Sequence, residues 1–139
     1  MVLKKVLVAL DGSKNSGRAL EMAIYLARQG NTKLTGILVL PPKPKKEYQK
    51  LPYPEKPMLE AADKIMEESR LLCAQNGILF EKKISFGLAG PAIVKFAKSL
   101  NYDIIVIGSR GMSGLKELFL GSVSHHIVHK SPIPVMIIK

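Results

Sequence analysis

Short, almost wholly apolar runs recur along this 139-residue chain, and segments with helical periodicity separate them. A strand that is apolar along its whole length is buried on both faces, as in a parallel sheet between two layers of helices. The alternation therefore predicts a single three-layer α/β domain over residues 1–139 with a five-stranded parallel sheet. The predicted strands are Val2–Leu10, Thr32–Leu40, Ile78–Phe86, Asp103–Ile107 and Ile133–Ile138.

The order of these strands decides where a ligand would bind. Helical patterns fill the gaps between the strands, and the last predicted helix is Gly121–Lys130. With the order 3-2-1-4-5, the ends of strands one and four would be neighbours where the order reverses, which is where such folds bind ligands. Asp11-Gly12-Ser13 follows strand one and Gly108-Ser109-Arg110-Gly111 follows strand four, so these two segments form the candidate site.

Residues 41–57 interrupt the alternation. The segment holds six of the nine prolines, and its five lysines are Lys43, Lys45, Lys46, Lys50 and Lys56. Because proline donates no backbone hydrogen bond, we expect an extended surface excursion here rather than a strand. A solvated loop, a lid, an obstruction of the pocket and a contact for phosphates or for an acidic partner are all open interpretations of this basic loop.

Composition limits the kinds of partner. The net charge of +10 favours an anionic partner. The cations do not form a recognition helix, and no aromatic residues interleave with the lysines in an RNP-like or stacking pattern, so no specific nucleic-acid partner is predicted. No apolar stretch approaches the roughly 20 residues that cross a bilayer, so no membrane span is expected. Cys73, the single cysteine, excludes an internal disulfide. We therefore expect a cytoplasmic location and read Cys73 as a small buried apolar residue.

The segment from 108 to 124 contains the residues that indicate an anion-binding site. Two residues separate Gly108 from Gly111, and nine residues separate Gly111 from a second cluster, Gly121-Ser122-Val123-Ser124. A glycine lets a ligand approach the backbone closely. Gly121 stands at the start of the last predicted helix, where free N–H groups and the positive end of the helix dipole favour an anion.

Polar side chains complete this candidate anion site. The hydroxyls of Ser122 and Ser124 are predicted donors to phosphate oxygens, and Arg110 is a candidate charged contact. On the opposite wall, Asp11 suits a ribose hydroxyl or a phosphate that carries magnesium. Asp11 has a second interpretation, as the cap of the first helix, and the two roles are compatible.

At this point the chain resembles a known family, the universal stress proteins, over nearly its whole length. The nucleotide-binding members of that family carry G-x2-G-x9-G-[S/T], which is matched by Gly108, Gly111, Gly121 and Ser122. The resemblance extends to Asp11-Gly12-Ser13, Gly87–Pro91, Asp103–Gly108 and Pro134–Ile138.

The resemblance to the ATP-binding subgroup implies an adenine nucleotide alpha hydrolase-like, Rossmann-like fold with strand order 3-2-1-4-5, usually dimeric. It implies ATP as the ligand, with Ala9 and Asp11 against the nucleotide and Val39 at the adenine. It places the ribose and phosphates at Gly108, Gly111, Gly121, Ser122 and Val123. The predicted nucleotide site is completed by the neighbouring residues Leu10, Ile107, Arg110 and Ser124.

The favoured function is an ATP-binding regulatory or stress-response module, with Mg²⁺ accompanying the ATP near Asp11. A slow ATP hydrolase and a dimeric interaction protein without a nucleotide stay open as alternatives. Efficient hydrolysis is not expected, because the chain has no G-x4-G-K-[S/T] phosphate loop and Glu117 is the only acid inside the glycine-rich segment. No catalytic residue is predicted.

Two features of the C-terminal quarter remain. His125 and His129 would share a helix face, as zinc ligands can, but no carboxylate or cysteine stands beside them, and a solvated face is favoured. Val135–Ile138 closes the sheet in sequence order, and two interpretations of its apolar residues are open. They pack only inward, or the strand also pairs antiparallel with a second copy of the chain. The second interpretation predicts a homodimer through this strand.

Overall fold

Five parallel strands form one sheet in the order β3-β2-β1-β4-β5 in the computed structural model, which describes residues 2–45, 53–110 and 120–139. Strand β1 lies at the centre, where Val6 pairs with Leu34 of β2 on one side and with Ile104 of β4 on the other. The strands are β1 Val6–Ala9, β2 Leu34–Leu40, β3 Phe80–Phe86, β4 Ile104–Gly108 and β5 Val135–Ile138. The predicted parallel sheet and its order are confirmed.

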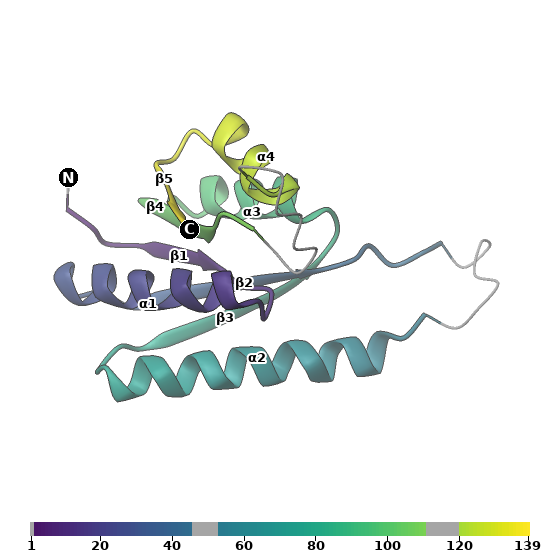
Figure 1. Cartoon of the computed structure of the whole chain (residues 1–139), viewed down its shortest axis with the longest axis horizontal. Helices are drawn as coiled ribbons and strands as arrows, with labels where there is room; N and C mark the ends of the chain where they lie inside the picture. Colours follow the sequence, from purple (N-terminus) through teal and green to yellow (C-terminus); the bar gives the residue numbers. More distant parts are fainter. Residues whose placement is uncertain (1, 46–52, 111–119) are drawn as a thin grey trace.

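Helices cover both faces of the sheet (Figure 1). One face is packed by α1 (Lys14–Gln29) and α2 (Glu55–Gln75), and the other by α3 (Ala89–Ser99) and α4 (Ser122–Lys130). The side chains of β1 alternate between the two apolar cores, with Val6 and Val8 in the α1–α2 core and Leu7 and Ala9 in the α3–α4 core. All four residues are buried, so the three-layer arrangement follows from the apolar character of the strand on both of its faces.

The first strand is shorter than predicted, because the sequence suggested Val2–Leu10 and the strand begins at Val6. The carboxylate of Asp103 takes the place of a neighbouring strand: its Oδ2 accepts hydrogen bonds from the backbone N–H groups of Lys4 (2.8 Å) and Lys5 (2.9 Å). The Asp103 N–H in turn donates to the Lys5 carbonyl at 2.9 Å. A side chain that binds two successive amides in this way ends the ladder.

The predicted excursion at 41–57 also ends earlier, because α2 begins at Glu55 and includes Pro57 in its first turn. A proline is tolerated there, since the first N–H groups of a helix have no intrahelical acceptor. Residues 41–45 are exposed and have no regular secondary structure. The base of the excursion is tied together by the Tyr53 hydroxyl, which donates to the Pro41 carbonyl at 2.9 Å, and by the Lys43–Glu55 ion pair at 2.7 Å.

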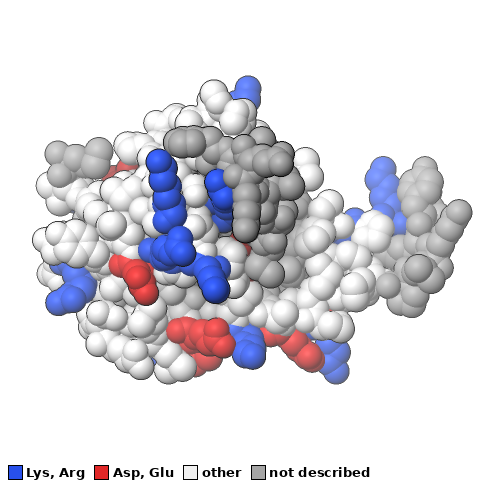
Figure 2. Space-filling view, in the orientation of Figure 1, with Lys and Arg blue, Asp and Glu red and all other residues white. Residues whose placement is uncertain are grey.

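Charge is unevenly distributed over the surface (Figure 2). Helix α2 carries five of the 11 acidic residues of the chain, and both acidic and basic side chains lie along the lower edge of the molecule in that view. The excess of positive charge therefore belongs to the remainder of the molecule. None of the helices in the described parts of the chain is long and apolar enough to cross a membrane.

The prediction for Cys73 is confirmed, because the residue is fully buried in the α1–α2 core. Burial raises the pKa of its thiol to about 11. The thiol therefore stays protonated near neutral pH and behaves as a small apolar side chain.

The hydrogen bonds from the backbone N–H groups of Lys4 and Lys5 to the Asp103 carboxylate predict a specific pH dependence of stability. The N–H groups of Lys4 and then Lys5 hold the pKa of the Asp103 carboxyl below its ordinary value. A depressed folded-state pKa stabilises the protein above the unfolded-state value of about 3.9, and this contribution is lost as the pH falls through the folded-state pKa. Asp103→Asn should therefore be less stable than the native chain near neutral pH, and the difference should shrink in acid.

Urea unfolding at about pH 7 and about pH 3 measures this difference. Asp63→Asn is the matched control, because the Asp63 carboxylate forms only an exposed pair with Lys82 at 3.4 Å. If Asp103→Asn and the native chain differ in free energy of unfolding by the same amount at both pH values, the carboxylate of Asp103 does not stabilise the fold through its lowered pKa.

Candidate functional site

A cavity of about 200 Å³ opens at the carboxyl ends of β1 and β4, between the start of α3 and the start of α4. These two strands are neighbours in the sheet. The strand that follows β1 in sequence lies on one side of the pair, and the strand that follows β4 lies on the other side. The cavity therefore occupies the switch point that the sequence indicated. It is lined by eleven of the twelve predicted residues: Ala9, Leu10, Asp11, Val39, Ile107, Gly108, Arg110, Gly121, Ser122, Val123 and Ser124. The twelfth, Gly111, lies outside the described residues.

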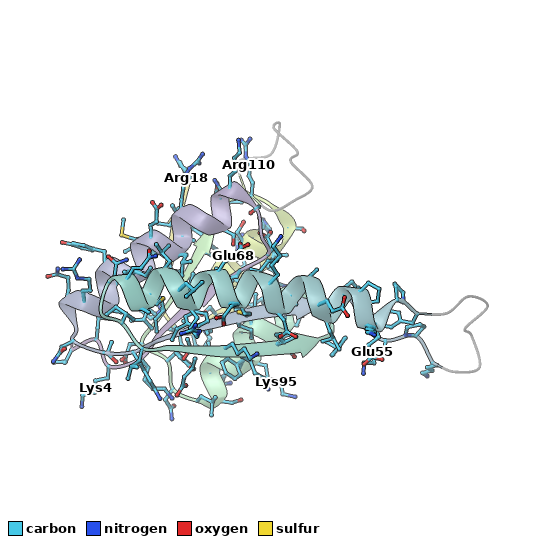
Figure 3. The ribbon with its side chains drawn as sticks, turned by 90° about the horizontal axis from the view of Figure 1, so that it is seen from below. Lys4, Arg18, Glu55, Glu68, Lys95 and Arg110 are labelled. Carbon is cyan, nitrogen blue, oxygen red and sulfur yellow. The ribbon has the colours of Figure 1, made fainter. Side chains whose placement is uncertain are left out.

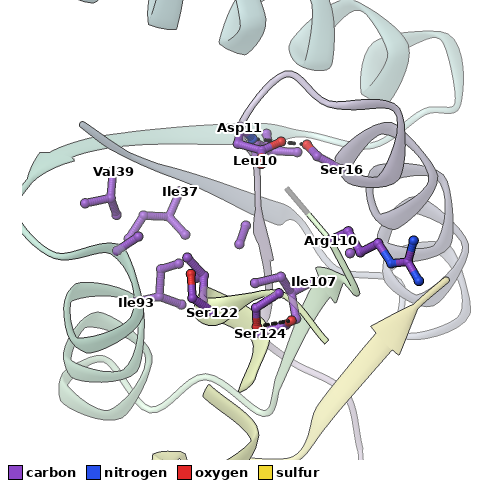
Figure 4. A pocket seen from close by; sticks show the side chains of 15 residues that line it. Leu10, Asp11, Ser16, Ile37, Val39, Ile93, Ile107, Arg110, Ser122 and Ser124 are labelled. Carbon is purple, nitrogen blue, oxygen red and sulfur yellow. Dashed lines mark hydrogen bonds between the residues drawn. The ribbon is translucent and has the colours of Figure 1, made fainter. Parts of the chain in front are cut away.

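One end of the cavity is apolar. Val39 and Ile37 of β2 face Ile93 of α3, and the three side chains gather on the same side of the close-up (Figure 4). Ala9 and Ala89 add small apolar surfaces to the lining. An apolar slot of this kind suits a flat ring system, because burial of the ring releases water from both surfaces.

Four lining residues were not predicted from the sequence: Ser16, Ile37, Ala89 and Ile93. Ile37 was accessible to prediction, since it lies two residues before Val39 and a strand repeats its faces every second residue. Ala89 and Ile93 are one helical turn apart on α3 and carry no chemical signal of their own. Only the packing of α3 against the end of β2 places them at the cavity.

The Asp11 wall is built by a tight turn between β1 and α1. The Oδ1 atom of Asp11 accepts from the Ser13 N–H at 2.8 Å, and the Asp11 N–H donates to the Ser16 hydroxyl at 3.1 Å. Ser13, and not Asp11, is the residue that caps α1, because its Oγ accepts from the Ser16 N–H at 3.1 Å. The interpretation of Asp11 as the helix cap is therefore wrong, and its exposed carboxylate stands at the rim of the cavity.

Gly108 is close-packed for a reason that the sequence did not reveal. A Cβ at this position would lie 2.9 Å from the backbone carbon of Asn15 and 3.0 Å from the Asn15 carbonyl oxygen. Glycine was expected here to let a ligand approach the backbone. In the structure it also allows the end of β4 to touch the first turn of α1.

Helix α4 points its N-terminus at the cavity. Gly121 is the N-cap. Among the described residues it makes no side-chain cap hydrogen bond, and the first turn contains no acidic residue. The first N–H groups of a helix have no intrahelical acceptors, so this end presents N–H donors and a partial positive charge. Ser122 is exposed at the first helical position and lines the cavity.

Ser124 and Arg110 line the cavity in ways that differ from their predicted roles. The Ser124 hydroxyl is buried and has the Ser109 carbonyl as acceptor at 2.9 Å, with the Gly121 carbonyl at 3.1 Å. A hydroxyl has one proton to donate, so it holds the backbone together instead of facing a ligand. The Arg110 side chain leads away from Ser122 and Val39 (Figure 4) and projects on the same side as Arg18 (Figure 3).

Two of the three histidines of α4, His125 and His129, bring their rings together at an interplanar angle of 52°. The ring centroids of His125 and His129 are 4.4 Å apart, as expected for residues one turn apart on a helix. In the described parts of the chain, no three His, Cys, Asp or Glu side chains come close enough together to hold a metal ion.

Fold and cavity together define an α/β domain with a cavity at the switch point of a parallel sheet. Residues 3–139 match the model of the Universal stress protein family, and the chain belongs to that family. It is 32% identical to the universal stress protein YxiE of Bacillus subtilis over 99% of this chain and 100% of that protein.

Solved structures show the same fold. The hypothetical protein MJ0577 superposes with a TM-score of 0.86 at 27% identity, covering 100% of this chain and 97% of the other. A universal stress protein solved in complex with cAMP has a TM-score of 0.78 at 24% identity, with 100% and 99% coverage. Another, from Archaeoglobus fulgidus in complex with dAMP, has a TM-score of 0.76 at 23% identity and covers both chains completely.

The contact between Gly108 and Asn15 predicts contrasting effects of two glycine substitutions. Gly108→Ala should destabilise the chain by about 1–3 kcal/mol, because the new methyl group collides with the α1 backbone. Gly17→Ala is the matched control, since no atom lies within 4 Å of its added Cβ. Alanine in this helical position should stabilise the chain by about 0.5–1 kcal/mol. Chemical unfolding measures both, and equal effects would contradict the close packing.

Proposed function

We propose that the chain binds an adenine nucleotide, ATP by expectation, in the cavity between β1 and β4, and that it acts as a regulatory or stress-response module. One observation carries the proposal: the uncapped N-terminus of α4 and the apolar slot at Val39 belong to the same cavity. The first suits a phosphate and the second suits a base. A nucleotide joins these two chemistries in one molecule.

The apolar end would hold the adenine. Ile37, Val39 and Ile93 offer aliphatic surface to the ring, and the described lining at this end has no charged side chain. Adenine is the least polar of the common purines in its hydrogen-bonding groups, so it loses least when it leaves water for such a slot.

The α4 end would hold the phosphates. The backbone N–H groups of Ser122 and Val123 follow directly on the N-cap, and the Ser122 hydroxyl is free of the internal bond that holds Ser124. Helix N-termini bind phosphate through such groups without any lysine. Asp11 stands on the opposite wall, where its carboxylate would accept a ribose hydroxyl or hold Mg²⁺ that accompanies the phosphates, since Mg²⁺ commonly combines one carboxylate with phosphate oxygens.

Relatives agree with this proposal at the level of the fold. Two universal stress proteins of the same fold have been solved with cAMP and with dAMP, both of which are adenine nucleotides. We propose binding as the main activity instead of efficient hydrolysis. Asp11 is the only carboxylate in the described lining, and its Oδ1 already accepts the Ser13 N–H.

The proposal is tested by calorimetric titration with ATP and by mass spectrometry of small molecules released when the purified protein is denatured. We expect ATP affinity in the roughly micromolar range, or co-purified adenine nucleotide, with turnover far slower than binding. Absence of both a titration signal and a released nucleotide would overturn the nucleotide proposal and favour an interaction protein whose ligand is of another kind.

Ser122→Asp separates binding from stability. A carboxylate in the first turn of α4 interacts favourably with the helix dipole and stabilises the helix by about 0.3–1 kcal/mol. The thermal midpoint of the variant should therefore equal or exceed that of the native chain. The same charge repels phosphates, and ATP affinity should fall about tenfold or more. Ser122→Asn is the neutral control of nearly equal shape and should bind ATP close to the native chain. If Ser122→Asp and Ser122→Asn bind ATP with equal affinity, the phosphates do not bind at the N-terminus of α4.

We also propose that two copies pair through β5. Within the described residues β5 has a neighbouring strand on one side only, and all four of its residues are half-buried and apolar. The Pro134 carbonyl accepts from the N–H of Ile105 in β4, and the Ile138 carbonyl accepts from the N–H of Ser109, which follows β4. The alternation along the strand therefore turns the backbone groups of Val135 and Ile137 toward the other edge.

Ile137→Pro tests this pairing, because it removes one outward N–H and leaves the bonds to β4 in place. We expect the native chain to be a dimer by light scattering and the variant to shift toward monomer. Ile137→Val keeps the N–H and should stay dimeric. A native chain that is monomeric at all accessible concentrations would contradict pairing through β5.

A further inference from the structure

The first turn of α1 is bonded to both strand ends that flank the cavity. On one side, the Ser16 hydroxyl accepts from the Asp11 N–H at 3.1 Å. On the other side, the Oδ1 atom of Asn15 accepts from the Ser109 hydroxyl and from the Arg110 N–H, each at 3.1 Å. Asn15 itself does not line the cavity. It is therefore placed to act on the site through other residues.

Ser109 connects Asn15 to the start of α4. Only 4% of Ser109 is exposed, and its carbonyl accepts from the Gly121 N–H at 2.6 Å and from the Ser124 hydroxyl at 2.9 Å. Its own N–H donates to the Ile138 carbonyl of β5 at 2.7 Å. The orientation of the Ser109 peptide thus determines where the N-cap of α4 lies.

The junction has little freedom to adjust. A Cβ on Gly108 would already collide with the Asn15 backbone, so α1 and the end of β4 are in contact at this point. The two bonds to Asn15 Oδ1 then fix the direction of the chain as it leaves β4. Without them, the buried Ser109 hydroxyl would lose its acceptor, and a buried polar group without a partner costs more than an average hydrogen bond contributes.

We propose that Asn15 is a positioning residue for the phosphate half of the nucleotide site, acting through Ser109 on the N-terminus of α4. The inference rests on the nucleotide binding proposed above. The proposal predicts different effects at the two ends of the cavity. Asn15 should affect the α4 end and leave the apolar slot of Ile37, Val39 and Ile93 unchanged. The described hydrogen bonds that join Asn15 to Ser109, and Ser109 to the start of α4, do not involve the slot residues.

Titration of Asn15→Ala with ATP and with adenosine tests the separation. Loss of the two bonds should weaken ATP binding about tenfold, whereas adenosine, which has no phosphate, should bind within about twofold of the native chain. A general loosening of the fold would weaken both ligands alike, and the ratio of the two affinities distinguishes the cases. Gly17→Ala, in the same stretch of α1, should change neither affinity.

A double-substitution cycle tests the route through Ser109. Ser109→Ala removes the hydroxyl that donates to Asn15, so Asn15→Ala combined with Ser109→Ala should weaken ATP binding clearly less than the product of the two single effects. Thermal unfolding of each variant reports whether it is folded. If Asn15→Ala does not fold, Ser109→Ala alone should show the same preferential loss of ATP over adenosine.

Each outcome decides between the two proposals. If the native chain binds ATP and Asn15→Ala binds it equally well, or loses ATP and adenosine equally, the positioning role is overturned and nucleotide binding stands. If the loss of ATP affinity in the double variant equals the product of the losses in Asn15→Ala and Ser109→Ala, Asn15 does not act through Ser109. If the native chain binds neither ligand, nucleotide binding fails, and the positioning role fails with it.

Discussion

Burial of β1 on both of its faces is the constraint on which the remainder of the structure depends. Val6, Leu7 and Val8 are at most 1% exposed, and each of the two cores takes alternate side chains from this strand. A strand in that position must have a strand on each side and a helical layer on each face. In the observed order β3-β2-β1-β4-β5, these two neighbours are β2 and β4, and the strand order reverses at β1.

That reversal creates the cavity. The connections that leave β1 and β4 turn toward opposite faces of the sheet, into α1 and toward α4, so the carboxyl ends of two adjacent strands are not covered by either helix. The gap is bridged by polar groups instead. The turn at Asp11 closes on Ser13 and Ser16, and the Ser109 peptide closes on Asn15, Gly121 and Ser124. Within the described residues, none of these bonds uses the backbone N–H groups of Ser122 and Val123 at the start of α4.

The two ends of the cavity therefore come from different physical sources. The apolar end is an extension of the α3–α4 core, where Ile37, Val39 and Ile93 continue the packing toward the carboxyl end of the sheet. The polar end is a helix terminus and a turn, held by hydrogen bonds to backbone atoms. The nucleotide proposed above would match both ends, with its base at the apolar end and its phosphates at the polar end. The basic surface outside α2 adds a favourable long-range potential for such an anion.

Much of this could be predicted from the sequence, because it depends on local periodicity. Apolar runs and helical spacing determined the five parallel strands and their helices, and the glycine and serine spacing from Gly108 to Ser122 indicated the family and the location of the site. Only the tertiary structure decided that Ser13 caps α1, that Asp103 replaces a strand partner for Lys4 and Lys5, and that Asn15 holds the chain after β4. Each of these choices depends on which of several equivalent donors and acceptors meet after the layers have packed. Periodicity carries no information on such long-range pairings, whereas a hydrogen bond forms only where distance and direction both allow it.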